Sequence, residues 1–522
     1  MDKSNGGFVG LSSNGRIAKN TLLLYLRMLI VMCVGLFTSR VVLSTLGIDD
    51  YGIYNVVGGL VALLGFLNGS MAGGTSRFLT YSLAKNDGKE TDRVFCTSML
   101  IHALVAVVLI VLSETVGLWF LYEKLVFPPE RLTAALWVYQ CTVFSVCVMV
   151  LCVPYNSLII AHERMSVFAS ISVGEALLRL LIVYMLWLGD VDKLVLYGIL
   201  SATVQLLLCS CQAIYCHRHF KLRLRLLWDR QLFMSMTRFS FWSLNGSFAL
   251  LCCTQGLNIL LNIFFGPAVN AARGVAVAVQ SKMMSFCYNF QMAVNPSITK
   301  SYASGEKERM HHLVAASSKF SFFLLLLVSM PVLLNLSQLL GIWLGTVPDF
   351  TREFVVIMIF SSMVRLQAAP LITAAYATGN IRKFQLWGGT TLLLVLPVTY
   401  LLLRYAHISA VWTMAAYLIG DTMAHVFRIC IILPMIGMRI TDYIRTVLRP
   451  IFLATAFAVL PLVTIRQLFF REISLRSLIL SVLLSLVITC LSCFFVGCGR
   501  RERKAIMRHA ANFMGRRRRS TP

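Results

Sequence analysis

The chain has 522 residues, of which 58% are hydrophobic and only 13% are charged. A soluble protein has about 45–50% apolar and about 25% charged residues, so the composition excludes an ordinary soluble domain and indicates a polytopic membrane protein. The net charge of +25 is explained by basic loops on the cytoplasmic side of a membrane, and we expect no nucleic-acid partner. The 15 cysteines have neither metal-ligand nor disulfide spacing, and we expect no metal and no cofactor.

About fourteen apolar stretches are long enough to cross a membrane, because roughly 20 apolar residues of helix span the hydrocarbon core. The polar leader before the first stretch has no cleavage site, so we expect no cleavable signal peptide. The uniform runs differ from the alternation of barrel strands. The predicted fold class is therefore all-α, a polytopic membrane protein with about 14 transmembrane helices. The predicted spans lie near residues 21–44, 53–75, 94–121, 134–161, 166–188, 194–216, 238–264, 268–295, 318–344, 353–377, 385–403, 409–433, 447–466 and 476–497.

Two pairs of stretches echo one another along the chain at a nearly constant offset. The stretches 45–89 and 264–307 each contain a helix end at a glycine, a tight turn, another span with a Ser/Tyr segment, and a small polar loop. The stretches that start at Pro154 and Pro370 each place an alanine seven residues later, before a short polar turn. These echoes predict two homologous halves with the functional site between them.

Lysine and arginine concentrate in the loops after even-numbered spans. The positive-inside rule then places both termini in the cytoplasm. An even number of spans in each half makes the repeats parallel, related by an axis along the membrane normal. The predicted organisation is a six-helix bundle over 1–216, a basic linker over 217–237, a second six-helix bundle over 238–433, two additional helices over 434–499 and a basic tail over 500–522.

Several basic side chains lie inside predicted spans, where each costs roughly 2.5–3.5 kcal/mol at the bilayer centre. They are Arg27, Arg40, Arg273, Lys282 and Arg365. We predict that they bind an anionic substrate, since arginine donates paired hydrogen bonds to phosphate. The alternatives are snorkelling to a headgroup for the first two and an internal ion pair for the last two. Arg273 and Lys282 are nine residues apart, which places them on opposite helix faces.

Two acidic residues inside spans have basic neighbours one helical turn away. Glu175 and Arg179 are four residues apart on one face. Asp421 shares a face with His425 and Arg428. We interpret both sets as internal pairs. The alternative for Asp421 and His425 is a proton or cation relay, because histidine titrates near neutral pH.

Glu114 lies near an external helix end and has no evident partner in its own helix, so it is either an interfacial residue or an ion-coupling site. Amide side chains near the basic residues can bind sugar hydroxyls or join helices to one another. They are Asn55, Asn68, Asn245, Asn258, Asn262, Asn289, Gln255 and Gln291. An anionic head, sugars and an apolar environment together favour a lipid-linked oligosaccharide as the substrate.

A family resemblance lies in the first 79 residues. Its elements are Asn20-Thr21, Ser39-Arg40, Leu46-Gly47, Tyr51-Gly52-Ile53-Tyr54 and Arg77-Phe78-Leu79. With them, the run from Arg16 to Leu79 resembles the O-antigen and capsule repeat-unit flippases of the multidrug/oligosaccharidyl-lipid/polysaccharide exporter superfamily. The resemblance implies two six-helix bundles, alternating access, and a central cavity lined by the first, second, seventh and eighth helices. The lipid II flippases are similar in having two extra C-terminal helices and cationic cavity residues, a role that the likeness extends loosely to Arg27, Arg273 and Lys282.

The resulting prediction is a flippase, not an enzyme, that translocates an undecaprenyl-pyrophosphate-linked oligosaccharide across the bacterial inner membrane. Its partners would be this substrate, membrane lipids and glycan-assembly enzymes such as a polymerase or glycosyltransferases. A cation-coupled multidrug antiporter of the same superfamily is the alternative, and it should have an unpaired acid in the cavity. A membrane polysaccharide polymerase or ligase is the second alternative. Such an enzyme needs a sizeable external loop, whereas the longest external segment, near residues 122–132, is short.

Overall fold

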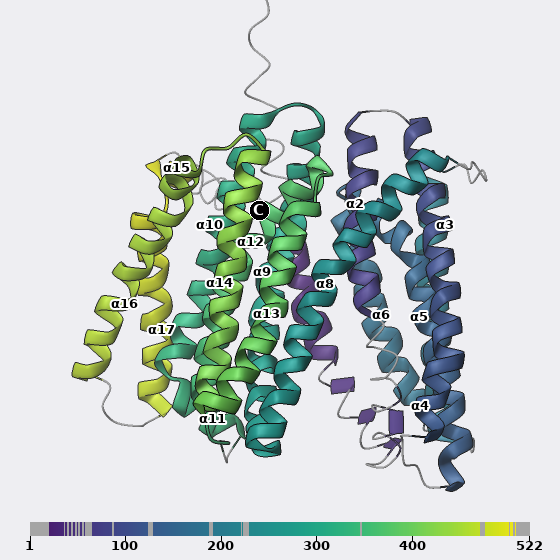
Figure 1. The fold of residues 1–522 in the computed structure, drawn as a ribbon, viewed down its shortest axis with the longest axis horizontal. Coiled ribbons are helices and arrows are strands. Elements are labelled where there is room, and N and C mark those ends of the chain that lie inside the picture. Colours follow the sequence, from purple (N-terminus) through teal and green to yellow (C-terminus); the bar gives the residue numbers. More distant parts are fainter. Residues whose placement is uncertain are drawn as a thin grey trace, which may run out of the picture. The chain divides into compact units, whose positions relative to one another are not determined.

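The computed structural model describes residues 20–35, 37–38, 41–42, 45–46, 50, 53–54, 57, 65–85, 88–123, 129–186, 192–220, 222, 229–344, 347–469, 475–500, 502–504 and 507. In these ranges the regular elements are helices and no strand occurs, which confirms the predicted all-α fold (Figure 1). The helices are α2 (Gly65–Ala84), α3 (Gly88–Leu112), α4 (Leu118–Glu123), α5 (Leu132–Ala161), α6 (Met165–Met185), α7 (Lys193–Phe220), α8 (Arg230–Phe265), α9 (Pro267–Ala303), α10 (Lys307–Leu334), α11 (Leu336–Leu344), α12 (Thr351–Thr378), α13 (Arg382–Ala406), α14 (Ala410–Met435), α15 (Ile440–Tyr443), α16 (Arg449–Phe469) and α17 (Leu475–Ser492).

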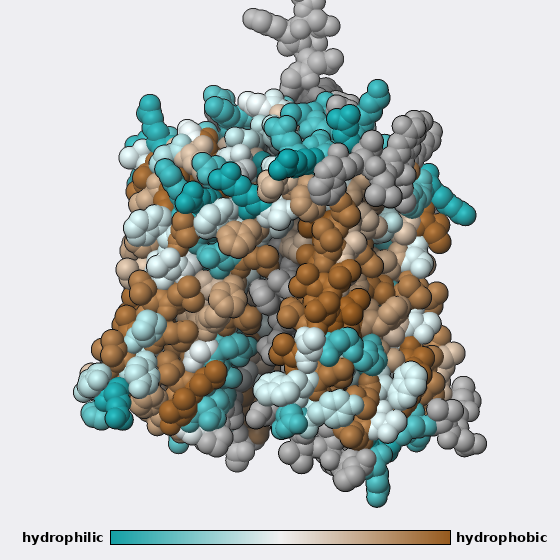
Figure 2. All heavy atoms as spheres, turned by 45° about the vertical axis from the view of Figure 1, so that its right-hand side comes forward, coloured by the Kyte–Doolittle hydropathy of each residue, from teal (hydrophilic) through white to brown (hydrophobic). Residues whose placement is uncertain are grey.

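Within the described ranges, 11 helices are long and apolar enough to cross a membrane, and the helix Asn20–Gly35 is apolar but shorter. Large apolar side chains on these helices face outward, as Phe452 does on α16 with 72% of its surface exposed. Figure 2 shows hydrophobic residues over the middle of the visible helices and hydrophilic residues towards their ends. Water would oppose such exposure, whereas lipid tolerates it. The chain is therefore a multi-pass membrane protein.

Helix α9 differs from the apolar span that the sequence predicts. It has 37 residues and is long enough to cross a membrane, yet it is too polar to be among the 11 apolar helices. Some of its polar groups bond to neighbouring helices. Gln291, 2% exposed, donates hydrogen bonds to Ser321 Oγ and to the Leu366 carbonyl oxygen, both at 3.0 Å. Partners of this kind allow a spanning helix to be polar.

The chain forms two compact units. The first comprises Met1–Leu251, Met292–Glu306 and Tyr376–Leu386, and the second comprises Cys252–Gln291, Lys307–Ala375 and Trp387–Pro522. Four helices, α8, α9, α12 and α13, contribute residues to both units. The first unit therefore combines helices of the predicted first half with the ends of helices from the predicted second half.

The two echoing proline stretches form matching helix–turn–helix elements. Pro154 lies inside α5 and Pro370 lies inside α12. Nine residues after each proline, the backbone turns through a left-handed residue, which is Glu163 with φ of 58° in one case and Gly379 with φ of 82° in the other. Only glycine adopts this region without steric cost, so a glutamate there is uncommon. The matching turns give the predicted repeat a structural counterpart.

The core of the first unit contains a tyrosine that compensates for an irregular helix. A π-helical turn at Ser113–Gly117 joins α3 to α4. Such a turn displaces backbone groups from their regular partners. The hydroxyl of Tyr139, on α5 and 1% exposed, donates a hydrogen bond of 2.7 Å to the Ser113 carbonyl oxygen. The bond satisfies a polar group that lipid could not hydrate.

The last two long helices, α16 and α17, pack against α10 in the second unit. Ser492 donates a hydrogen bond of 2.6 Å to the Ala454 carbonyl oxygen and so joins the end of α17 to α16. Ser481 on α17 donates to the Asn335 side chain, which follows α10, at 3.1 Å. These contacts fit the prediction of two helices added to the repeated bundles.

Candidate functional site

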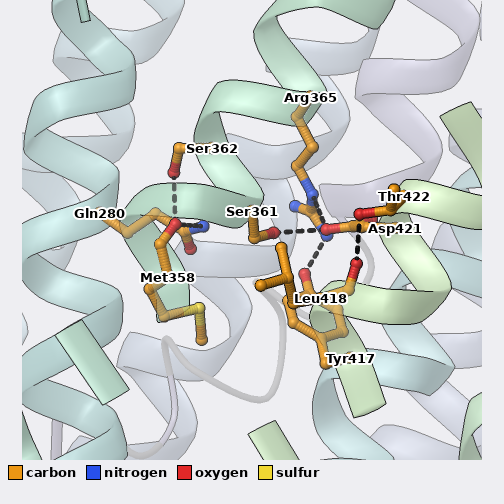
Figure 3. A network of polar contacts seen from close by, with 9 residues as sticks. All are labelled: Gln280, Met358, Ser361, Ser362, Arg365, Tyr417, Leu418, Asp421 and Thr422. Carbon is orange, nitrogen blue, oxygen red and sulfur yellow. Dashed lines mark hydrogen bonds and ion pairs between the residues drawn. The ribbon is translucent and has the colours of Figure 1, made fainter. Parts of the chain in front are cut away.

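A buried ion pair lies in the second unit between α12 and α14 (Figure 3). Arg365 Nε lies 2.8 Å from Asp421 Oδ2, and the Asp421 side chain is 2% exposed. Ser361 donates to the same carboxylate oxygen, and Tyr417 Oη accepts a hydrogen bond from the Arg365 guanidinium. Additional hydrogen bonds of this kind are what allow a buried pair to offset its desolvation. The network therefore neutralises its own charge.

This arrangement is one of the two that the sequence left open for Arg365. The sequence offered an anion site or an internal ion pair, and the ion pair is present. Asp421 binds a residue on another helix, whereas the sequence suggested partners within its own helix. His425, the other half of the predicted relay, is 7% exposed, and neither ring nitrogen has a hydrogen-bond partner in the described part of the chain.

Arg273, on α9, is buried without a bonded carboxylate among the described residues. Its side chain is 8% exposed. It donates hydrogen bonds to Asn258 Oδ1 at 3.0 Å and to the Thr254 carbonyl oxygen at 2.7 Å, both on α8. Its Nε has no hydrogen-bond partner in the ranges that the structure describes. Neutral acceptors satisfy hydrogen-bond donors but do not cancel charge, so this guanidinium keeps its positive charge.

Lys282 lies on the exposed side of the same helix, as its spacing from Arg273 predicts. The apolar Val277 is also exposed on this helix, and five other exposed positions, three or four residues apart, have small or polar side chains. They are Gly274, Ala278, Ser281, Ser285 and Tyr288. A lipid-facing helix surface would be apolar. The stripe around Lys282 is therefore suited to a polar surface that water or a polar ligand can reach.

The first unit contains a cavity of about 410 Å³ beside the helix Asn20–Gly35. Its lining residues are Arg27, Val31, Gly35, Thr38, Val42, Tyr54, Ser172, Glu175, Ala176, Arg179 and Tyr197. Arg27 Nη1 donates to Ser172 Oγ at 3.5 Å, and its guanidinium lies 4.9 Å from the Phe168 ring centroid. These contacts hold a cation at the cavity wall.

The charges that line this cavity do not cancel. Glu175 Oε1 accepts from Arg179 Nε at 3.0 Å and lies 2.9 Å from Nη2, which confirms the predicted pair on α6. Arg27 lines the same space. Two arginines therefore face one glutamate, and the lining has a net positive charge. Tyrosine and serine hydroxyls complete it, which is the mixture that recognises a phosphate and neighbouring hydroxyl groups.

Glu114 belongs neither to the Arg365–Asp421 network nor to the lining of the cavity. Glu114 is exposed in the π-helical turn, where Gln140 Nε2 donates to it at 3.3 Å. Arg40 lies outside the described residues. The sequence did not single out Ser361 or Tyr417, although each lies four residues before a charged member of the ion pair, on the same helix face. That spacing was the signal that could have identified them.

No family model matches the chain, and no curated protein matches it. Solved structures do. A MATE in the bent conformation superposes with a TM-score of 0.67 at 14% identity, over 83% of this chain and 97% of that chain. An outward-facing multidrug resistance MATE transporter of the MOP superfamily gives 0.64 at 14%, over 82% and 96%. A MOP superfamily transporter from Pyrococcus furiosus, described as having a binding pocket of reverse polarity that suggests a different function, gives 0.63 at 14%, over 82% and 96%.

At these identities the likeness concerns the fold. The chain has the MATE-like transporter fold, in which two helical bundles repeat one another. The predicted two-bundle architecture is thereby confirmed.

Proposed function

We propose that the protein is a membrane transporter that moves an anionic, lipid-linked oligosaccharide across the bilayer by alternating access. The proposal rests on one observation. Cationic side chains outnumber acidic ones both in the cavity beside the helix Asn20–Gly35 and in the region of Arg365, Asp421 and Arg273. Asp421 and Glu175 each bind an arginine, whereas Arg273 is buried against neutral acceptors. An excess of this sign favours an anion within a membrane.

The chemistry of the cavity suits a phosphate more than a carboxylate alone. A guanidinium donates two parallel hydrogen bonds, which match two oxygens of a phosphate. Arg27 and Arg179 supply two such groups on the wall of one cavity. Hydroxyls of Tyr54 and Tyr197 line the same space and can bond to sugar hydroxyls. An undecaprenyl diphosphate with its first sugar presents these groups together.

Glu175 has a defined part in this proposal. In the empty cavity it offsets the charge of Arg179, because the two are bonded within one helix. An arriving phosphate competes with the carboxylate for the same guanidinium. The site is then stable without substrate, and binding exchanges one anion for another at modest electrostatic cost. Release on the opposite side restores the pair within the helix.

We infer the direction of transport from the side of the membrane on which the basic loops are expected. The substrate enters from the predicted cytoplasmic side, and its phosphates hold the bundles together while the opposite side opens. A membrane potential of 100 mV contributes about 2.3 kcal/mol for each charge moved. No covalent step is proposed. The lipid tail remains in the membrane throughout.

A multidrug antiporter is the second candidate, and the similar solved structures favour it. One of them is a multidrug resistance MATE transporter. In that case Glu175 or Asp421 would bind the organic cation or the coupling ion. Both acids are bonded to arginines, which an arriving cation would have to displace.

The two candidates predict opposite effects of Glu175→Gln. The purified protein and this variant are reconstituted in liposomes that contain a labelled lipid-diphosphate oligosaccharide or a cationic dye with an ion gradient. A flippase flips the lipid, and Glu175→Gln preserves or raises the rate because an internal competitor is lost. An antiporter transports the dye; Glu175→Gln loses that transport where Glu175 is the cation-binding acid, and Asp421→Asn loses it where Asp421 is. Extension of the glycan by the purified protein would instead indicate a polymerase or ligase.

A further inference from the structure

The two left-handed turns of the repeat are both contacted by a cationic side chain from another helix. At the first turn, Lys300 Nζ from the end of α9 lies 2.9 Å from Glu163 Oε1. The side chains of the pair are 32% and 15% exposed. Asn20 Nδ2 donates to the Glu163 carbonyl oxygen at 3.5 Å. An acidic residue therefore holds the end of α9 at the turn between α5 and α6.

At the second turn, the cation is Arg77 from the C-terminal half of α2, which ends at Ala84. Arg77 Nη2 donates to the Ala377 carbonyl oxygen at 3.4 Å. Its guanidinium lies against Gly379, where an added Cβ would be 2.5 Å from Nη2. It also lies over the Phe78 and Phe239 rings, with centroid distances of 4.4 and 5.2 Å. The glycine that permits the turn thus also makes room for the arginine.

The two contacts are related crosswise by the sequence repeat. α2 belongs to the stretch 45–89 and α9 to its echo 264–307. Glu163 and Gly379 occupy matching places after Pro154 and Pro370. Each half therefore contributes one cationic helix end and one left-handed turn, and each helix end meets the turn of the other half. All four segments lie in the first compact unit.

We infer that these contacts are two matching latches of one gate, which closes the transport path at the end of the bundle where α2 and α9 terminate. Lys300 with Glu163 forms the first latch, and Arg77 with the Ala377–Gly379 backbone forms the second. The inference goes beyond the proposed substrate, because either a flippase or an antiporter needs the path closed at one end at a time.

The composition of the latches suits contacts that break and reform. The first latch is polar and lies at the end of α9, and the second places a guanidinium beside a backbone carbonyl oxygen, so rupture of either exposes groups that water can solvate. The first is partly exposed. Pro296 lies inside α9, four residues before Lys300, and Pro370 lies inside α12 before Ala377. A proline lacks the backbone N–H and weakens the preceding turn, so the end of α9 can bend away from the turn that it contacts, and the end of α12 can move the second turn away from Arg77.

The test uses hydrogen–deuterium exchange of the full-length protein in lipid nanodiscs. The variants are Glu163→Lys, Lys300→Glu and the exchange of both charges. Each single reversal places like charges at the latch, and we expect exchange at the α5–α6 turn and at the end of α9 to rise by about tenfold or more. The double variant restores an opposite-charge pair and is expected to restore protection. Glu123→Lys, an exposed reversal on α4, is the matched control and should change neither segment.

A second readout separates a gate from a merely structural contact. Opening one end of an alternating-access transporter closes the other, so the single reversals should lower exchange at the α8–α9 turn near Gly266, at the opposite end of α9. A rise at both ends, or failure of the double variant to restore protection, would overturn the inference. Unchanged exchange at the α5–α6 turn would overturn it as well.

The second latch has its own variant. Gly379→Ala adds a Cβ where Arg77 lies and strains a residue with φ of 82°. We expect faster exchange at the α12–α13 turn and at the end of α2, with the same fall near Gly266. If Gly379→Ala does not fold, Arg77→Gln removes the cation without adding volume and should give the same pattern. Protection of these segments as in the wild type would contradict the second latch.

Discussion

Arg365 Nε on α12 lies 2.8 Å from Asp421 Oδ2 on α14, so a deeply buried acid of the second unit is already bound to a cation. The carboxylate is 2% exposed and Ser361 donates to it as well. This pair separates two roles that the sequence had assigned together. Arg365 is paired with an acid, whereas Arg273 is bonded to neutral acceptors, and its anion-binding role is a proposal.

The first prediction concerns the stability of this pair. Replacing either partner alone, as in Arg365→Met or Asp421→Asn, leaves the other buried without its counterpart and should cost about 3–5 kcal/mol. The double variant Arg365→Met with Asp421→Leu removes both charges and should cost much less. Thermal unfolding in detergent measures the series. Equal losses for the single and double variants would mean that the two charges do not stabilise each other.

The second prediction concerns Arg273. Arg273→Gln removes a cation that has neutral acceptors, so no counter-charge is left unpaired. We expect a small change in thermal stability and a weakening of binding to a short-chain polyprenyl diphosphate by about 10- to 100-fold, the loss of one or two charge-assisted hydrogen bonds. Arg352→Gln, which replaces an arginine in the first turn of α12, serves as the control. Unchanged binding by Arg273→Gln would remove this residue from the site.

The third prediction concerns Tyr139. Tyr139→Phe removes the hydrogen bond to the Ser113 carbonyl oxygen while keeping the ring. The free energy of unfolding should fall by about 1–3 kcal/mol, because a buried acceptor loses its partner. Denaturant unfolding measures the change, with the exposed Tyr122→Phe as a control. A neutral result would show that another donor reaches the π-helical turn.

The fourth prediction concerns pH. Burial lowers the pKa of His162, in the turn between α5 and α6, and the charges of Lys300 and Arg164 lower it further. The ring stacks on Phe220 with a centroid distance of 3.9 Å. The folded protein therefore favours the neutral ring, and the unfolded chain binds more protons below the ordinary pKa of 6.5. This contribution to stability is present above pH 6.5 and is lost as the pH falls through the lowered pKa.

The corresponding measurement compares unfolding of the wild type and His162→Phe between pH 4 and 8, roughly the range in which histidine titrates. The difference in unfolding free energy between the two proteins should change with pH below about 6.5 and be constant above it. A difference that is constant over the whole range would contradict the lowered pKa.

The sequence predicted local features well because local spacing determines them. Glu175 and Arg179 are four residues apart on one helix, and they pair as predicted. The long apolar helices follow from the length that a bilayer requires. Contacts across helices were not predictable in the same way. Arg365 and Asp421 are 56 residues apart, and no pattern within either helix specifies the partner.

Polar helices were harder to interpret than apolar ones. α9 was expected as an apolar span that contains two charges, yet its amides bond to neighbouring helices. Hydropathy cannot distinguish such buried partners from exposure to water. The anion-binding roles of Arg27, Arg273 and Lys282, the ion-coupling roles of Glu114, Asp421 and His425, the termini in the cytoplasm and the glycan-assembly partners stay predictions.

The most direct test of the proposed transport is flipping of a labelled lipid-diphosphate oligosaccharide by the purified protein in proteoliposomes, measured for the wild type and Arg273→Gln at equal protein content. The proposed function predicts that the wild type flips the lipid and that the variant, although folded, flips it at least about tenfold more slowly. No flipping by the wild type, together with gradient-driven uptake of an organic cation, would contradict the proposal and assign the protein to the antiporters.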